Sequence, residues 1–221
     1  MKIGVIVAMD SEFTRLSELI GASGRVGRNT VLLARCGIGK VNAALGASRM
    51  ILEERPDCIL SSGCAGGLGE GVNVMDLVVG AQCAYHDVWC GEGNEYGQVQ
   101  GLPARFEADA RLIAAATGLQ TGSRIHAGLI VSGDQFITDP AKEEKILERF
   151  PEALAVDMES AAIAQVCKQS GVPFCSLRQI SDGADDGSAE DYTEMNDRAE
   201  DALCLCVLAL CKKILAEDAL W

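Results

Sequence analysis

Acidic side chains follow three of the apolar runs in this sequence. Glu12 comes after the first run, Glu159 after a short run further along, and Asp182 after a run that also contains Arg178. If these runs are strands, the acids lie at their carboxyl ends, where α/β sheets bind their ligands. A helix N-terminus explains one acid at each place, with Asp10 as a cap and Glu12 as a complement to the helix dipole. It does not explain the whole set, so these positions are the first candidates for chemistry.

Two glycine-rich segments, residues 37–39 and 63–69, also follow apolar runs. Their backbone amides can approach an anion or a sugar closely, although a tight connection between two elements has the same composition. Neither segment matches a nucleotide-binding fingerprint, because the first lacks a third glycine and the sequence contains no G-x-x-x-x-G-K-[ST]. The sequence therefore argues against Rossmann and P-loop sites. Phe136 follows another polar turn, where its ring either joins the core or stacks on a base.

The composition narrows the classes of partner. The chain has 221 residues and a formal net charge of −13 at pH 7, so nucleic acid is not an expected partner, because neutralising phosphates requires a basic surface. The first apolar run spans about six residues, which is too short for a signal peptide or a membrane span. We therefore expect a cytoplasmic protein with no membrane partner. The ten cysteines show no C-x-x-C spacing and are expected to be reduced core residues rather than metal ligands.

Short β-rich runs alternate with amphipathic helical stretches along the whole chain, which predicts a single α/β domain over residues 1–221. Strands are expected at residues 2–8, 30–36, 58–62, 77–85, 125–131, 154–156 and 174–180. Helices are expected from residue 10 or 11, from residue 40, and at residues 108–116, 140–150, 159–169 and 190–216. In the second helix the apolar pattern predicts an inner face that comprises Val41, Ala44, Leu45, Ala47, Ser48, Ile51 and Leu52. A polar loop is expected between residues 87 and 105.

Seven motifs in register carry a family resemblance. They are AMDSE at residues 8–12, CGIGKVNAALG at 36–46, SGCAGGL at 62–68, YHD with EYGQ at 85–98, GLIVSGDQFI at 128–137, VDMESAAIAQVC at 156–167 and RQISDGAD at 178–185. Through them the chain resembles, almost end to end, the 5′-methylthioadenosine/S-adenosylhomocysteine nucleosidases of the purine nucleoside phosphorylase superfamily. The resemblance implies a three-layer α/β/α sandwich with a mixed, twisted, partly barrel-like sheet. It also implies a homodimer that hydrolyses the adenine–ribose bond of a purine nucleoside with no cofactor and no metal.

The chemistry of this reaction accounts for the acidic residues. Breaking an N-glycosidic bond generates a ribosyl cation-like transition state, and the purine leaves well only when one of its nitrogens is protonated. By resemblance, Asp182 donates that proton toward N7, with Ser181 placing its carboxyl group and Arg178 organising the loop. Glu159 would bind the ribose hydroxyls and stabilise the cation, and Glu12 would hold and activate the attacking water.

The resemblance also implies a set of residues that line the substrate. Phe136 would stack on the purine, the backbone of Ile137 would contact its edge, and Met158 would pack against the sugar. The rest of the expected set comprises Cys64, Ala65 and Gly66 around the water and ribose, Ile38 and Tyr192 at the 5′ substituent, and Ala8, Met9 and Asp157.

Three departures from the family pattern concern the substrate. Cys64 stands where serine is common, and Asp157 stands where glutamate is common. The segment 87–96, expected near the partner's pocket in the dimer, carries Glu92 and Asn94 where relatives usually place aromatic residues. The preferred 5′ substituent is therefore left open.

Other activities on the same scaffold also remain open. A phosphate-dependent phosphorylase is the nearest alternative, but such relatives commonly carry an arginine at the position of Ser61, so hydrolysis is favoured. Nucleosidases for futalosine, adenosine or inosine share the same acids. A noncatalytic nucleoside-binding protein would lack an acid or a base, whereas Glu12, Glu159 and Asp182 are all present.

Overall fold

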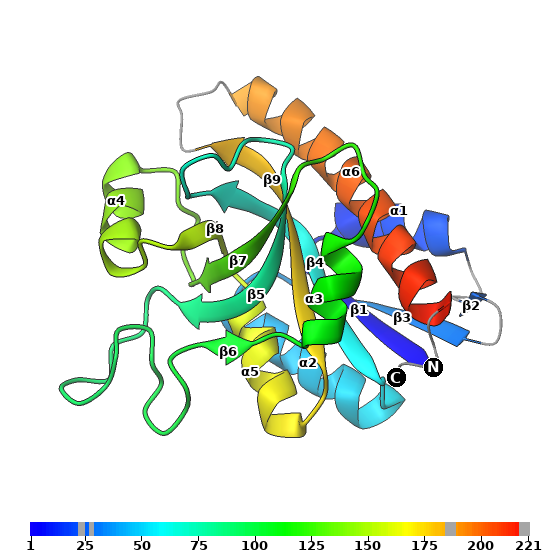
Figure 1. Ribbon diagram of the computed structural model, residues 1–221, viewed down its shortest axis with the longest axis horizontal. Coiled ribbons are helices and arrows are strands. Elements are labelled where there is room, and N and C mark those ends of the chain that lie inside the picture. Colours follow the sequence, from blue (N-terminus) through cyan, green and yellow to red (C-terminus); the bar gives the residue numbers. More distant parts are fainter. Residues whose placement is uncertain (22–24, 27–28, 184–188, 217–221) are drawn as a thin grey trace.

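The computed structural model describes residues 1–21, 25–26, 29–183 and 189–216 (Figure 1). The strands in these ranges are β1 (Lys2–Val7), β2 (Arg25–Val26), β3 (Asn29–Arg35), β4 (Cys58–Gly67), β5 (Leu77–Tyr85), β6 (Phe106–Glu107), β7 (Ile125–Ser132), β8 (Ala153–Asp157) and β9 (Phe174–Gly183). The helices are α1 (Asp10–Ile20), α2 (Lys40–Glu54), α3 (Ala110–Thr117), α4 (Pro140–Arg149), α5 (Ser160–Ser170) and α6 (Ala189–Ala216). The expected order of strands and helices is therefore confirmed, and β2 and β6 are additional short strands.

The strands form one mixed sheet that closes partly on itself. Its order is β2-β3-β1-β4-β8-β7-β5-β6, and β9 pairs with both β4 and β5. Strands β4, β8, β7, β5 and β9 therefore make a closed ring, while β1 and β3 extend the sheet beyond it. The β4–β9, β5–β7 and β7–β8 pairs are parallel, whereas β5 and β9 are antiparallel. This mixed, partly barrel-like sheet is the one that the family resemblance implied.

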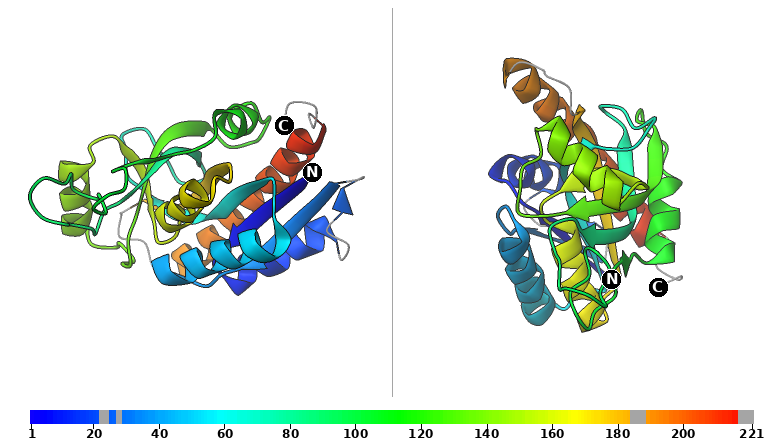
Figure 2. Two further views of the ribbon diagram at one scale, coloured as in Figure 1. Left: turned by 90° about the horizontal axis from the view of Figure 1, so that it is seen from below. Right: turned by 90° about the vertical axis from the view of Figure 1, so that its left-hand side faces the viewer.

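Helices cover both faces of the sheet. One core joins β1, β4, β5 and β9 to α1, α3 and α6, and a second core joins the opposite face to α2 and α5, which lie together in Figures 1 and 2. Helix α4 packs on a smaller cluster at one end of the ring. The expected three-layer arrangement is confirmed. Among the described helices, none combines the length and apolar character needed to cross a bilayer.

Helix α2 presents a different face to the core from the one expected. Val41, Leu45 and Leu52 are 70%, 61% and 76% exposed, whereas Ala43 and Ala47 are fully buried. The helix carries two apolar stripes, and the stripe of small side chains lets its backbone approach the sheet and α5 closely. The assignment of Val41, Leu45 and Leu52 to the inner face was therefore wrong, and these three form an apolar row on the surface, whereas Ala47 and Ile51 do face the core as expected.

Two strands extend beyond their expected ends. The segment from Gly63 to Gly67 continues β4 instead of forming a tight connection, because its backbone pairs with β9 on one side and with β8 on the other. Strand β9 continues past Ile180 through Asp182. These extensions bring the two candidate segments into direct register, with Gly66 opposite Asp182.

Candidate active site

The candidate acids meet around the end of β4. Glu12 lies in the first turn of α1, Glu159 precedes α5, and Asp182 is on β9. A Cβ atom on Gly63 would lie 3.0 Å from Glu12 Oε1 and 3.4 Å from Arg178 Nη1. A Cβ atom on Gly66 would lie 3.1 Å from Asp182 Oδ1. Glycine is therefore the residue that lets these side chains lie directly against the β4 backbone.

Glu12 is 3% exposed and is held mainly through one of its two oxygens. Its Oε2 accepts hydrogen bonds from the N–H groups of Ala8 and Met9, each at 3.0 Å, while Oε1 is 3.4 Å from the Cys64 nitrogen. Burial raises the pKa of the Glu12 carboxyl, although the two backbone donors and Arg178 oppose the shift. The expected cap Asp10 is exposed and pairs with Arg35 at 2.9 Å, so Glu12 is the residue that closes the first turn.

Glu159 is also buried, and it faces the opposite side of the same guanidinium. Its Oε1 accepts the Gly39 N–H at 2.9 Å, and its Oε2 lies 3.9 Å from Arg178 Nη2. Burial and then the nearby Asp157 charge raise the pKa of Glu159, while Arg178 and the Gly39 amide lower it. The carboxylate is thus fixed at one oxygen while its second oxygen remains close to the centre of the site.

Arg178 and Asp157 form a buried ion pair at the bottom of the site. Arg178 is 1% exposed, and its Nε donates to Asp157 Oδ2 at 2.6 Å. Ser132 Oγ donates to Oδ1 of Asp157 at 2.5 Å, and Ser160 donates to the same carboxylate through its hydroxyl and its N–H. Arg178 Nη2 also donates to Ser61 Oγ at 3.0 Å. Because its oxygens accept bonds from these protein groups, Asp157 orients Arg178 from behind the substrate space.

Asp182 is half-buried, whereas Glu12 and Glu159 are buried. Burial is the cause that raises the pKa of its carboxyl. The neighbouring Ser181 is 4% exposed. A carboxyl that is buried in this way favours its protonated form, which is the form that can donate a proton.

The glycine-rich segments have a role that the sequence indicated only in general terms. Their amides do approach anions closely, but these anions include the protein's own carboxylates: Gly39 N–H bonds Glu159, and Lys40 N–H bonds Asp134 at 2.8 Å. Gly39 has a φ of +94°, a conformation that glycine adopts readily. Ser132 and Ser160, which bond Asp157, and Ser176, which bonds Ser160, were not predicted as site residues, and their position after or within apolar runs was the available signal.

Comparisons with known proteins show the family to which the chain belongs. The model of the phosphorylase superfamily matches residues 2–212. The curated 5′-methylthioadenosine/S-adenosylhomocysteine nucleosidases of Exiguobacterium sp. and Shewanella piezotolerans are 38% and 39% identical to the chain, and each alignment covers 97% of this chain and 99% or 100% of the relative. The chain belongs to the 5′-methylthioadenosine/S-adenosylhomocysteine nucleosidase family.

Solved structures of this nucleosidase family share the fold. The enzyme from Neisseria meningitidis in complex with methylthio-immucillin-A has a TM-score of 0.89 and 37% identity, with 96% of this chain and 98% of that chain covered. The enzyme from Colwellia psychrerythraea in complex with adenine has a TM-score of 0.88 and 34% identity, with 96% and 95% covered.

The residues expected to line the nucleosidase substrate lie on several elements. Cys64, Ala65 and Gly66 lie on β4, between Glu12 and Asp182. Ala8, Met9 and Met158 are half-buried beside the acids. Ile38 and Phe136, at 53% and 58% exposed, lie on two segments that meet through the contact of Asp134 with the amide of Lys40, and Ile137 is half-buried against α4. The side chain of Tyr192 lies outside the described residues.

Proposed function

We propose that this chain hydrolyses the N-glycosidic bond of 5′-methylthioadenosine and S-adenosylhomocysteine, with adenine and a free 5′-substituted ribose as products and no cofactor. The observation that carries the proposal is the meeting of Glu12, Glu159 and Asp182 around Gly63 and Gly66, each with a pKa raised by burial. General acid catalysis at the base, stabilisation of a cationic sugar and activation of water are the three tasks of this reaction. The three acids match these tasks in number and environment.

Asp182 is the proposed acid. Burial raises the pKa of its carboxyl and so favours the form that carries a proton, and transfer of that proton to N7 turns adenine into a neutral leaving group. As the bond lengthens, positive charge develops on the ribose. Glu159 then accepts hydrogen bonds from the ribose hydroxyls, and its negative charge stabilises the cation.

Glu12 is the proposed base for water. Its Oε2 is occupied by two backbone amides, whereas Oε1 has, among the described residues, only the long contact with the Cys64 nitrogen and can accept a proton from a bound water. The raised pKa makes Glu12 a stronger base than an exposed glutamate. The hydroxide equivalent adds to the sugar carbon, and the proton passes to Glu12.

The site favours water over phosphate as the second substrate. The position at which phosphorylases commonly carry an arginine is the buried Ser61, whose hydroxyl accepts a bond from Arg178. The Arg178 guanidinium is paired with Asp157, and Lys40 is paired with Asp87 at 2.7 Å. Each of these two cations beside the acids is already neutralised by a carboxylate.

The proposed working form is a cytoplasmic homodimer in methionine salvage. The apolar row of α2 supports the dimer, because Val41, Leu45 and Leu52 expose large side chains on one helix and continue toward Ile38 and Phe136 at the site. The segment 87–96 would then lie near the partner's pocket. A second copy of the chain is the partner that such an apolar face fits, since covering it removes these side chains from water.

One incubation series tests the activity. The purified chain is incubated with methylthioadenosine, S-adenosylhomocysteine, adenosine and inosine, each with and without phosphate, and free base and sugar are measured. Adenine release from the first two nucleosides with a free reducing sugar, at a rate independent of phosphate, is the expected result. Formation of a ribose 1-phosphate would identify a phosphorylase instead, and release of base only from inosine would move the assignment to another nucleosidase.

A further inference from the structure

Glu200 is a buried carboxylate that the proposed reaction does not use. It lies on α6 and is only 1% exposed. Ser11 Oγ and Asn196 Nδ2 donate to its Oε1 at 3.0 and 2.9 Å, and Arg15 Nε lies 3.3 Å from Oε2. Burying a carboxylate costs free energy unless its oxygens are hydrogen-bonded or ion-paired. These contacts therefore offset part of the desolvation cost of Glu200.

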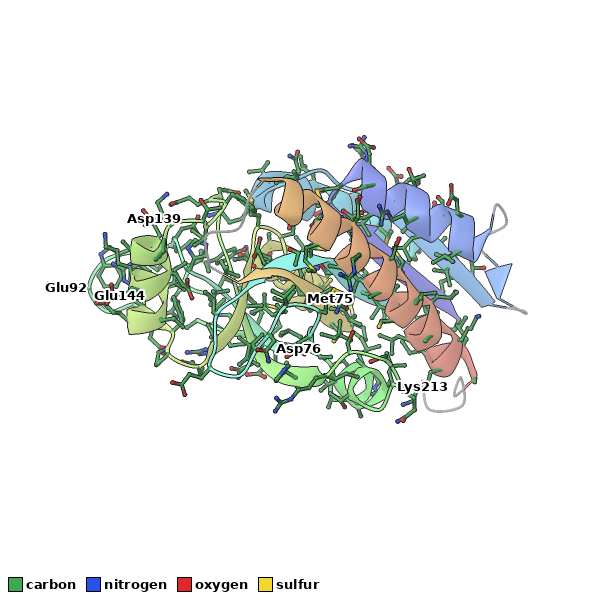
Figure 3. All side chains as sticks on the ribbon, turned by 90° about the horizontal axis from the view of Figure 1, so that it is seen from above. Met75, Asp76, Glu92, Asp139, Glu144 and Lys213 are labelled. Atoms are coloured by element: carbon green, nitrogen blue, oxygen red, sulfur yellow. The ribbon has the colours of Figure 1, made fainter. Side chains whose placement is uncertain are left out.

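Arg15 fixes this carboxylate by joining α1 to α6. Its Nη1 donates to Asp201 Oδ1 at 2.7 Å and to the Asp197 carbonyl at 2.6 Å, and its Nη2 donates to Asp197 Oδ1 at 2.8 Å. The two helices run side by side in Figures 1 and 3. The Asp197 and Asp201 carboxylates lie on the surface, with side chains 57% and 71% exposed, whereas Glu200 points inward.

Glu200 contacts the first turn of α1, which carries the candidate base Glu12. Ser11, which donates to Glu200, is the residue directly before Glu12 in the first turn of α1. We propose that Glu200 is a positioning residue, which fixes the first turn of α1 from behind and directs a fixed negative charge toward the Glu12 carboxylate. This inference rests on the proposed role of Glu12 as the base that activates water.

The charges around Glu12 support this arrangement. Burial is the main cause that raises the pKa of Glu12, and the charge of Glu200 adds to the shift, whereas Arg178 on β9 opposes it. The negative charge of Glu12 in turn raises the pKa of Glu159 and of the thiols Cys64 and Cys204. Glu200 therefore acts in the same direction as burial: it makes Glu12 a stronger base, while Arg15 keeps Glu200 itself paired.

Two variants separate the charge of Glu200 from its contact with the first turn of α1. Glu200→Gln keeps an oxygen for Ser11 and Asn196 but removes the charge. The acidic limb of the pH profile of kcat/KM is expected to move to lower pH, by on the order of one unit or less. The plateau kcat is expected to fall about 3-fold, because a weaker base transfers the proton less readily, with KM unchanged. Ser11→Ala removes one bond at an exposed position and is expected to lower kcat without moving the limb.

Asp201→Asn is the matched control, because it removes a charge that pairs with the same arginine on the exposed side of the helix. It is expected to leave the pH profile and kcat unchanged. An unmoved acidic limb in folded Glu200→Gln, or an equal shift in Asp201→Asn, would overturn the inference. If Glu200→Gln does not fold, an unchanged kcat in Ser11→Ala has the same meaning. An inactive wild-type chain would instead contradict the proposed function, so the two failures are distinguishable.

Discussion

At the scale of single residues, burial acts on all three acids but their neighbours give them different roles. Glu12 and Glu159 each have backbone donors and face Arg178, so interactions that favour the charged form oppose the effect of burial. For Asp182, burial is the cause of the raised pKa. Asp182 is therefore the proposed acid: burial favours its protonated form, whereas Arg178 and the backbone donors favour the charged forms of Glu12 and Glu159.

Replacing the acid tests this assignment directly. Asp182→Asn is expected to lower kcat by about 10²- to 10⁴-fold, because an amide cannot protonate the leaving base and this range is typical of one general acid. The measurement is steady-state adenine release, with folding checked by thermal unfolding. Glu144→Gln is the control, since Glu144 is exposed on α4 at one end of the molecule (Figure 3). Near-normal turnover in folded Asp182→Asn would remove Asp182 from the mechanism.

Replacing the base is expected to separate activity from stability. The pKa of Glu12 is raised above its ordinary value of 4.5, so the folded chain binds more protons than the unfolded chain between 4.5 and the raised value. Stability therefore falls as pH rises through that window. Glu12→Gln should lose water attack with little change in substrate binding, yet unfold at a higher temperature than the wild type at pH 7.

The pH dependence of that difference is the decisive measurement. The stability gain of Glu12→Gln should disappear as the pH approaches 4, where the wild-type carboxyl is protonated in both states. Each kcal/mol gained corresponds to roughly 2–4 °C in a chain of this length. A variant that is less stable than the wild type at pH 7, or equally more stable at both pH values, would contradict the raised pKa of Glu12.

At the scale of elements, the sequence predicted the strands and helices well but not where two of the strands end. Periodicity and apolar runs identify an element by what it buries, and they located β1, β5, β7 and α5 closely. The end of β4 has no such signal, because Gly63, Gly66 and Gly67 have the composition of a turn. Their strand conformation depends on pairing with β8 and β9, which are about 100 residues away in sequence.

The same limit applies to the site. The acids could be predicted because their types and positions after apolar runs reflect chemistry. The role of Asp157 as a support for Arg178 could not, because its bonds to Ser132 and Arg178 join residues that are more than 20 positions apart in sequence and meet only when the strands pair. The inner face of α2 was assigned wrongly at three positions for a related reason. The sequence of a helix with two apolar stripes does not reveal which stripe packs against the sheet.

The close approach at β4 gives a prediction for this element. Gly63→Ala would place a Cβ atom 3.0 Å from Glu12 Oε1 and 3.4 Å from Arg178 Nη1, so the Glu12 carboxylate must move by a few tenths of an ångström. Overpacking of this kind costs about 1–3 kcal/mol of unfolding free energy. A fall in kcat larger than the change in KM is expected, since Glu12 is displaced.

Gly122→Ala is the control for that substitution. Gly122 has no heavy atom within 4 Å of its added Cβ, so its replacement is expected to change neither kcat nor stability measurably. Equal activity of the Gly63 and Gly122 variants would show that the tight contact with Glu12 is not needed for turnover.

At the scale of the whole molecule, the apolar row of α2 is the feature that a monomer does not explain. Val41, Leu45 and Leu52 expose large side chains on one helix. Ile38, Trp89 and Phe136 are further large apolar residues that are exposed. The chain carries a net charge of −13, so copies repel one another over most of their surface. An uncharged apolar row is where that repulsion is weakest and where burial gains most, about 25 cal/mol for each Å² of apolar area removed from water.

A charge placed in this row should therefore prevent dimer formation. Leu45→Glu is expected to shift the chain from a dimer to a monomer in light scattering after size-exclusion chromatography, because a buried unpaired carboxylate costs several kcal/mol at an interface. Leu205→Glu is the matched control, since Leu205 on α6 is 59% exposed against 61% for Leu45 but lies outside the row. If the partner's 87–96 segment completes the pocket, Leu45→Glu also raises KM for methylthioadenosine, and the effect diminishes at higher protein concentration. Dimers in both variants would mean that α2 is not the interface, and monomers in the wild type would mean that each chain works alone.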